Sequence, residues 1–349
     1  MVSQATKTIK LRVRDKHAKL LREMSAETNQ VWNFANDLGH RMIRERGHWM
    51  TGFDYSAYTA GASKEFEHIG SSTIQEVCEQ FASKRRTARK VRLRWRKSIG
   101  DKRSLGWVPF KARATKYKSG QVFFAGRWFK VWDSYGLTPD IKFRAGCFTE
   151  DARGRWYFCA AIAVEVESGT GQDRIGIDLG CKDAVTCSDG TKLTGRWYRK
   201  AEKELATAQR ARRKKRARAI HAKIKNRRSD DLHKFSRELV NRSGEIYVGD
   251  VSSVKMVKTK MAKSALDASW ASLKTMLEYK SQQAGIVYKE VNEAYTTRAC
   301  SECGALTGPQ GLTGLSVRDW QCSGCGGLHD RDVNSARNIL SLGAGHCAP

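Results

Sequence analysis

The chain has 349 residues, enough for two or three domains of roughly 100–200 residues each. A hydrophobic content of 40% with a mean hydropathy of −0.58 is typical of a globular protein and argues against disorder throughout. The 64 Lys and Arg residues exceed the 36 Asp and Glu residues by 28, and the pI is near 9.9. This charge predicts a polyanionic partner, because a small neutral substrate would not need such a field.

Membrane spanning and secretion are not expected. The longest apolar run, residues 156–164, has nine residues, whereas a spanning helix needs about 20. The first ten residues lack the apolar core of a signal peptide. The ten cysteines are spread along a long chain and four of them form CxxC pairs, so a reducing cytosol is favoured over a disulfide scaffold.

The N-terminal half begins with a strand and two helices. Residues 6–14 alternate between apolar and polar, which predicts a half-buried strand with a basic outer face. Apolar residues recur at intervals of three and four residues over residues 16–46 and 72–97, so both segments are expected to be amphipathic helices. The second helix ends in a basic run for which nucleic-acid contact is favoured over simple solvation. That run contains Lys84, Arg85, Arg86, Arg89, Lys90, Arg92, Arg94, Arg96 and Lys97.

Residues 105–166 read as short, aromatic-rich strands separated by glycine, which is typical of a β-barrel or sandwich. Trp128, Phe129 and Trp132 could stack on bases, but core packing is the favoured interpretation of aromatics in such a module. The polar segment 167–172 is the expected linker at the main domain boundary.

Strands and helices alternate in the C-terminal half. Strands are predicted at 173–180, 184–187, 245–251 and 285–291, and helices at about 197–239 and 265–284, which together favour an α/β sheet. The first helical segment is strongly basic, and phosphate contact is expected there as well. Its candidate residues are Arg210, Arg212, Arg213, Lys214, Lys215 and Arg216.

Four cysteines form the most specific local signal. Cys300 and Cys303 are followed after eighteen residues by Cys322 and Cys325, and paired CxxC knuckles at this separation predict a tetrahedral zinc site. All four ligands are cysteine, so no coordination position is left for a reactive water and the zinc is expected to be structural. A redox or iron site is the alternative.

Two aspartates predict a second site. Asp178 lies in a buried apolar strand, where a carboxylate needs a reason such as a cation. Asp332 lies at a predicted helix start, where an N-terminal cap is the simplest role, and Asp178 could likewise be a turn residue beside Gly180. Together they suggest a carboxylate pocket for Mg²⁺, which prefers oxygen ligands.

Four segments resemble TnpB proteins, which are transposon-encoded RNA-guided DNA endonucleases related to the miniature type V CRISPR effectors. The segments are Ile175-Gly-Ile-Asp-Leu-Gly180, residues 269–280, residues 295–304 and residues 330–340. The motif match covers residues 175–340, about half of the chain, and the N-terminal half agrees in layout only.

The resemblance implies an α+β multidomain fold. Its parts are a wedge β-barrel at residues 1–15 and 104–168 with a helical recognition insertion at 16–103, a RuvC-like nuclease domain of RNase H fold at 173–298 and 327–349, and an inserted four-Cys zinc ribbon at 299–326.

It also implies a function. A structured guide RNA would pair with double-stranded target DNA, the protein would read a short flanking DNA motif, and two Mg²⁺ ions would support phosphodiester hydrolysis, beside one structural zinc. The expected location is the bacterial or archaeal cytoplasm, at the nucleoid, and monomer and homodimer both stay open.

The family uses three acids, and two carry over as Asp178 and Asp332. The family has a Glu at the end of another sheet strand, where this chain has Gly249. Glu293 at the tip of the neighbouring strand is the favoured replacement, because strands lie about 4.8 Å apart and glycine leaves room. Asp250 is the alternative, although one step along a strand turns a side chain to the opposite face.

A third explanation for Gly249 is a nuclease-inactive, RNA-guided DNA-binding protein that acts as a repressor. A guide-independent RNase H-like nuclease or transposase is a further alternative. Both buried aspartates are present, and this favours the active enzyme.

Overall fold

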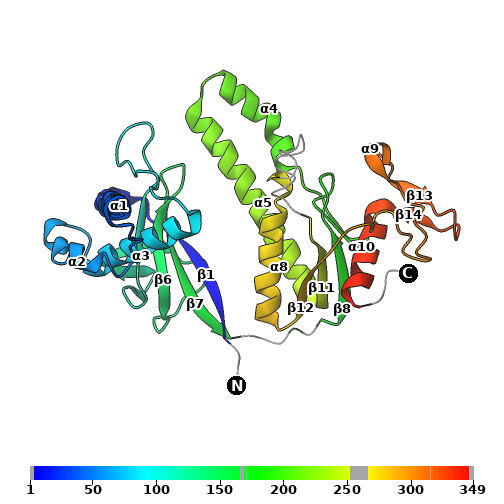
Figure 1. Cartoon of the computed structure of the whole chain (residues 1–349), viewed down its shortest axis with the longest axis horizontal. Coiled ribbons are helices and arrows are strands. Elements are labelled where there is room, and N and C mark those ends of the chain that lie inside the picture. The colour runs from blue at the N-terminus through cyan, green and yellow to red at the C-terminus, as the bar shows by residue number, and fades with distance from the viewer. Residues whose placement is uncertain (1–3, 166–168, 170, 252–265, 315, 346–349) are drawn as a thin grey trace. The chain divides into compact units, whose positions relative to one another are not determined.

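The computed structural model describes residues 4–165, 169, 171–251, 266–314 and 316–345. The chain divides into two compact units, one of residues 6–164 and one of residues 165–349 together with the first five (Figure 1). Residues 167, 168 and 170 of the expected linker lie outside the described part. In the described part, no helix combines the length and the apolar character that crossing a membrane requires.

The first unit contains a seven-stranded sheet in the order β2-β6-β7-β1-β5-β4-β3. Its strands are β1 (Gln4–Val13), β2 (Trp107–Phe110), β3 (Lys116–Lys118), β4 (Gln121–Phe124), β5 (Arg127–Trp132), β6 (Phe143–Glu150) and β7 (Trp156–Glu165). Its helices are α1 (Ala18–Arg46), α2 (Ser56–Thr59) and α3 (Ser71–Ala88), with short 3-10 turns at Asp15–His17 and Ala62–Glu65. The predicted strands are confirmed.

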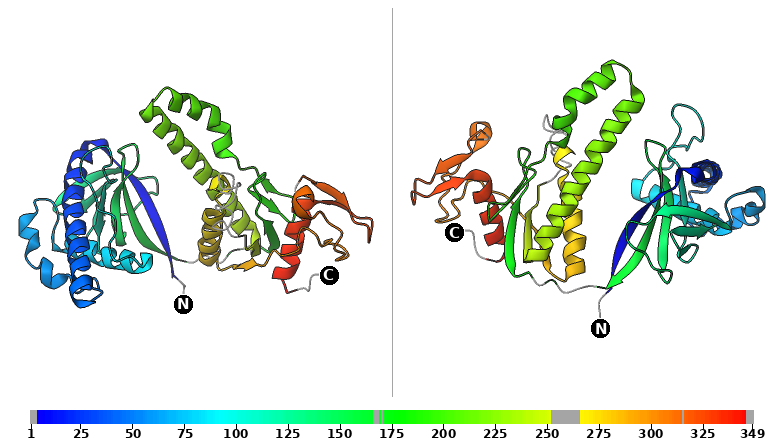
Figure 2. Two further views of the ribbon diagram at one scale, coloured as in Figure 1. Left: turned by 45° about the horizontal axis from the view of Figure 1, so that its top comes forward. Right: turned by 180° about the vertical axis from the view of Figure 1, so that it is seen from behind.

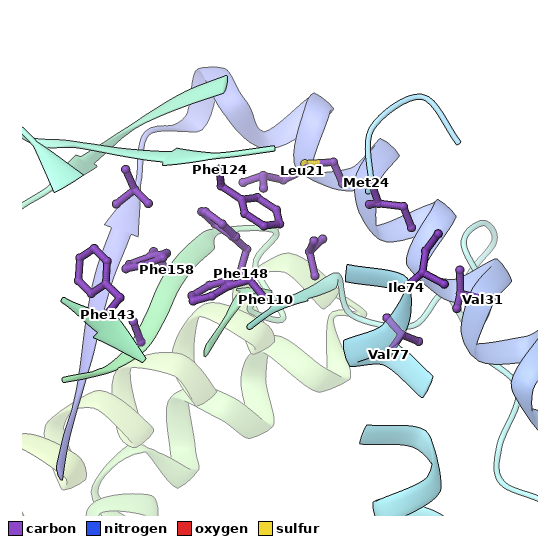
Figure 3. Close-up of a cluster of buried hydrophobic side chains, with 14 of the residues drawn as sticks. Leu21, Met24, Val31, Ile74, Val77, Phe110, Phe124, Phe143, Phe148 and Phe158 are labelled. Atoms are coloured by element: carbon purple, nitrogen blue, oxygen red, sulfur yellow. The ribbon is translucent and has the colours of Figure 1, made fainter. Parts of the chain in front are cut away.

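An aromatic cluster forms the core of this unit. Phe110 stacks on Phe158 with ring centroids 5.3 Å apart, and Phe148 meets both rings (Figure 3). The core also contains Phe129, which is fully buried, whereas Trp128 and Trp132 are exposed. The core interpretation of these three aromatics is therefore right only for Phe129.

The prediction of a helix through residue 97 is wrong, because α3 ends at Ala88. Arg89 then takes a left-handed conformation with φ 49°, and the chain runs on without regular secondary structure. The physical reason is tertiary: side chains of α1 bind the backbone of residues 93–96 in place of helical hydrogen bonds.

The second unit contains a five-stranded sheet in the order β10-β9-β8-β11-β12. Its elements are β8 (Asp173–Asp178), β9 (Val185–Cys187), β10 (Lys192–Leu193), α4 (Trp197–Arg210), α5 (Lys214–Arg242), β11 (Ser243–Gly249), α8 (Trp270–Ala284) and β12 (Val287–Val291), then α9 (Gly311–Gly314), β13 (Asp319–Gln321), β14 (Leu328–Asp330) and α10 (Arg331–Gly343). Strands β8, β11 and β12 are parallel, β9 is antiparallel to β8, and β10 at the edge is antiparallel to β9. The predicted mixture of helices and strands is confirmed.

Helices cover both faces of this sheet, with α10 on one and α5 and α8 on the other (Figures 1 and 2). Ile175, Ile177 and Val248 belong to the core beneath α5 and α8. The intervening residue Gly176 faces α10, where an added Cβ would collide with the carbonyl oxygen of Ala336. This alternation directs Asp178 toward α10 as well.

Candidate functional site

Three carboxylates meet at the carboxyl ends of the parallel strands. Asp178 is the last residue of β8, Glu293 lies two residues beyond β12, and Asp332 is the second residue of α10. All three line one cavity of about 770 Å³. In sheets of this kind the carboxyl edge is where ligands bind, so the fold brings the acids to the expected place.

Asp178 is partly buried and faces α10. The hydroxyl of Ser335 donates a hydrogen bond of 2.9 Å to its Oδ1. Burial raises the pKa of Asp178 to about 7, and the charges of Asp332 and Glu293 act in the same direction. A cation bound beside Asp178 would oppose both causes and lower its pKa.

Glu293 occupies the space that Gly249 leaves open. A Cβ on Gly249 would lie 2.7 Å from Oε2 of Glu293 and 3.3 Å from Cδ1 of Ile339. Burial raises the pKa of the Glu293 carboxyl, and the charge of Asp250 adds to the rise. The Glu293 carboxylate can therefore occupy this place only if residue 249 has no side chain.

Asp250 takes a different position. It is exposed, its amide binds the carbonyl of Val291 at 2.8 Å, and it is not among the described residues that line the cavity. Its Oδ1 accepts a 3.4 Å hydrogen bond from the backbone amide of Glu293. Asp250 thus contacts the chain beside the acid site, not the cavity itself.

Asp332 is not the cap of α10. Asp330 takes that role, with Oδ1 accepting from the amides of Asp332 at 2.9 Å and Val333 at 3.0 Å. The carboxylate of Asp332 is instead paired with Arg318 at 2.7 Å and Arg331 at 2.8 Å. The prediction that Asp332 caps the helix is therefore wrong, because the cap lies two residues earlier, at Asp330. The Asp332 carboxylate lines the cavity and is paired with two guanidinium groups.

The donor set fits Mg²⁺, because three carboxylates supply oxygen ligands around one cavity that has room for water. Burial and then the charges of Asp332 and Glu293 raise the pKa of Asp178, and a bound divalent cation would lower it again. Among the described residues, however, the three carboxylates do not form a group within 4.8 Å of one another.

The sequence interpretation missed the polar residues that hold the acids. Besides its bond to Asp178, Ser335 lies 2.9 Å from the hydroxyl of Thr296, which in turn lies 2.8 Å from the carbonyl of Glu293. This chain of hydroxyl groups connects the elements that carry two of the acids. Ser335 follows Asp332 by one helical turn, so the spacing could have revealed it. Thr296 lies in the motif segment 295–304, although its role as a hydroxyl contact has no signal of its own, and nothing in the sequence marks Arg318.

The four cysteines form a cluster whose sulfurs all lie within 4.8 Å of one another. The Cys300–Cys325 and Cys303–Cys322 sulfurs are 3.7 and 3.6 Å apart. A tetrahedron with metal–sulfur bonds of about 2.3 Å has edges of about 3.8 Å, whereas a disulfide is about 2.05 Å long. The prediction that the four cysteines come together at the spacing of metal ligands is therefore confirmed.

Polar groups favour a thiolate at one of the four cysteines, Cys322, whereas the pKa values of Cys303 and Cys325 are raised, in part by hydrogen bonds with the other sulfurs. The Thr307 hydroxyl and nearby backbone amides lower the pKa of Cys322 to about 6. His329 lies with Nε2 3.1 Å from the sulfur of Cys300, beneath the ring of Trp320. Hydrogen bonds of this kind orient the residues that bind a metal ion.

The basic candidates differ in accessibility. Arg85 is only 1% exposed, and the guanidinium of Arg96 donates to the carbonyl of Leu105 at 2.7 Å, so both are engaged inside the first unit. The other candidates are exposed, namely Lys84, Arg86, Arg89, Lys90, Arg92 and Arg94 in the first unit, and Arg210, Arg212, Arg213, Lys214, Lys215 and Arg216 around the turn between α4 and α5.

Two family models match the chain. Residues 157–260 match OrfB_IS605, described as "Probable transposase", and residues 270–339 match the "Cas12f1-like, TNB domain". The "Putative RNA-guided DNA endonuclease" of Streptomyces pristinaespiralis is 35% identical over 56% of this chain and 52% of its own length. InsQ of Escherichia coli K12, with the same description, is 28% identical over 62% of this chain and 60% of its own length.

The Cas12f1 endodeoxyribonuclease of Sulfoacidibacillus thermotolerans is 27% identical over 34% of this chain and 28% of its own length. The chain thus spans about half to three fifths of the two curated relatives with the longer matches. The "Cryo-EM structure of the Cas12f1-sgRNA-target DNA complex" aligns with 96% of this chain and 98% of that chain, at 16% identity and a TM-score of 0.40. The resemblance to TnpB proteins is therefore confirmed by two family matches and by relatives named RNA-guided DNA endonuclease and TnpB-like protein.

Proposed function

We propose that the chain is an RNA-guided DNA endonuclease that binds a structured guide RNA and cleaves guide-matched DNA by metal-dependent hydrolysis of phosphodiesters. The observation that carries the proposal is the convergence of Asp178, Glu293 and Asp332 on one cavity at the carboxyl edge of the sheet. The descriptions of the relatives, RNA-guided DNA endonuclease and Cas12f1, support the same activity. The charge of +28 suits a protein that holds RNA and DNA together.

The proposed domains follow from this function. Residues 173–298 and 327–349 form a RuvC-like domain of RNase H fold, in which β8, the segment after β12 and α10 carry the acids. Residues 299–326 form the ribbon. Residues 1–15 and 104–168 form the wedge, and residues 16–103 form the recognition insertion.

Asp178, Glu293 and Asp332 would hold two Mg²⁺ ions. When bound, the ions supply activation of the attacking water and stabilisation of the leaving 3′ oxygen. The chain's own residues orient the acids: Ser335 fixes Asp178, and the absence of a side chain at Gly249 lets Glu293 reach the cavity. The four-Cys cluster would hold one zinc ion that stabilises the ribbon.

One observation favours a second candidate, an RNA-guided DNA-binding protein without nuclease activity. Both oxygens of Asp332 are engaged by arginines, and the acids are not grouped within 4.8 Å in the described residues. In that case the protein would bind guide-matched DNA and leave it intact.

The test uses the full chain purified with the RNA that accompanies it. Sequencing that RNA gives the guide, and a matched and an unmatched DNA are then incubated with the complex and Mg²⁺. The proposal predicts cleavage of matched DNA only, stopped by EDTA and by Asp178→Ala. Matched binding without cutting supports the second candidate, and cutting that ignores the guide supports a guide-independent nuclease.

A further inference from the structure

The segment that follows α3 has an unusual support. Asn36 donates to the carbonyl of Leu93 at 2.8 Å and accepts from the amide of Leu93 at 2.9 Å. One helical turn away, Asn33 makes the same two contacts with Arg96, both at 2.9 Å. Two side chains of α1 therefore pair with this backbone as a neighbouring strand would.

Further contacts fix the same segment. The indole Nε1 of Trp32 donates to the carbonyl of Arg94 at 3.2 Å, and Asn29 donates to the hydroxyl of Ser98 at 3.1 Å. The side chain of Leu93 packs against the hydrophobic core. A chain segment without helix or strand is thus held in one conformation along its length.

This support sorts the cations into two sets. Arg96 points inward, where its guanidinium lies 5.3 Å from the ring of Trp107 and donates to the carbonyl of Leu105. The other cations of the segment are exposed, namely Arg89, Lys90, Arg92, Arg94 and Lys97. We call residues 89–97 the basic strip.

Trp95 lies on the exposed side of the basic strip. Its side chain is 44% exposed, although burying a large indole ring is favourable in free energy. The guanidinium of Arg92 lies 5.2 Å from the ring. An indole on a rigid support among cations is a platform for base stacking. A base pair inside a duplex hides its faces, so the platform suits an unpaired base.

We propose that the basic strip binds a single-stranded segment of nucleic acid, with Arg94 and Lys97 on the phosphates and an unpaired base on Trp95, whose ring Arg92 flanks while it is paired with Asp37 at 3.5 Å. The proposal rests on the proposed function only for the source of the strand, which is an unpaired part of the guide RNA or a displaced DNA strand. Because the backbone of the strip is already fixed, little conformational entropy opposes binding there.

The test measures binding of the full chain to fluorescent oligo-dT, oligo-U and a DNA duplex of equal length by anisotropy. Trp95→Ala should weaken single-strand binding by about 5- to 100-fold and leave duplex binding within about twofold. Arg94→Ala should weaken both and lower the salt dependence by nearly one unit of slope. Comparing oligo-dT with oligo-U shows which source the strip prefers.

Trp49→Ala is the matched control, because this tryptophan lies in the same unit, is 45% exposed and has the guanidinium of Arg85 5.2 Å from its ring. Asn33→Ala removes no charge but frees the backbone of Arg96, so it should weaken single-strand binding as well. The proposal is overturned if Trp95→Ala has no more effect than Trp49→Ala, or if it weakens duplex binding and single-strand binding equally. Guided cleavage by the unaltered chain is measured in a separate experiment. A chain that does not cleave DNA can therefore still be tested for single-strand binding.

Discussion

The four-Cys cluster and the acid cavity lie in the same unit but are assembled differently. The cysteines come from 26 consecutive residues, 300–325, and their sulfurs already have tetrahedral spacing. The acids are far apart in the sequence, at 178, 293 and 332, and they share a cavity without forming a close group in the described residues. Local loop geometry fixes the first site, whereas the second depends on strand alternation, a helix and a glycine.

The surroundings of the two sites differ as well. Hydroxyl and amide donors lower the pKa of Cys322, which prepares a thiolate for a metal. In contrast, burial raises the pKa of Asp178, and the carboxylate of Asp332 is paired with Arg318 and Arg331. This difference is what the proposed function expects of a structural metal at the four cysteines and of an acid site that a cation completes on binding.

The largest expected effect concerns the ribbon metal. The protein should contain about one zinc per chain, and Cys322→Ser should lose it, because structural zinc supplies on the order of 10 kcal/mol of folding free energy. Metal analysis and limited proteolysis within residues 299–326 measure this. Cys181→Ser is the control and should keep the zinc. A chain that keeps its metal and its protease resistance after Cys322→Ser would contradict the structural role.

Gly249→Ala should separate activity from stability. The added Cβ would meet the mobile end of Glu293, which can move away at little cost, so the melting temperature should change by only a few degrees. Guided cleavage should nevertheless fall about 100-fold, because the carboxylate leaves its place. Gly70→Ala, where nothing lies within 4 Å of an added Cβ, is the matched control. Unchanged cleavage by Gly249→Ala would show that this position of Glu293 is unimportant.

Ser335→Ala tests whether hydroxyl groups position the acid site. Without its 2.9 Å bond, Asp178 loses orientation, and the Mg²⁺ concentration for half-maximal cleavage should rise about tenfold. A merely structural role would lower the folded fraction and leave that concentration unchanged. Arg337→Ala, an exposed change on the same helix, should alter neither quantity.

The pH dependence should show the raised pKa of Asp178. A carboxyl group with a pKa of about 7 in the folded state and near 3.8 when unfolded binds more protons in the folded state between these values. The metal-free protein should therefore lose stability as pH rises from about 4 to 7, and Asp178→Asn should flatten this slope. Binding of Mg²⁺ should release nearly one proton at pH 6 and little at pH 8. Thermal melts and calorimetry in two buffers measure both effects, and equal proton release at the two pH values would contradict the shift.

Much of this organisation could be predicted where the signal is local. Cysteine spacing gave the metal cluster, and apolar periodicity gave the strands of both units. The position of Asp178 in a strand and that of Asp332 at a helix start were predicted from the local pattern as well.

The failures have tertiary causes. The end of α3 depends on asparagines about 60 residues earlier in the chain, and no periodicity in residues 72–97 reveals them. The two guanidinium partners of Asp332 could not be foreseen either, because Arg318 reaches it from the loop before β13. Burial also divides the basic run: Arg85 and Arg89 carry the same side chain, yet only Arg89 is exposed.

The most direct test of the acid site compares Glu293→Gln with Asp250→Asn in cleavage of guide-matched DNA at saturating Mg²⁺. Both variants remove one negative charge at the same end of the sheet, but only Glu293 lines the cavity. The account predicts a loss of at least about 1,000-fold for Glu293→Gln, on the order of 4 kcal/mol in the barrier, and a change within about threefold for Asp250→Asn. Full activity of Glu293→Gln together with loss in Asp250→Asn would contradict it.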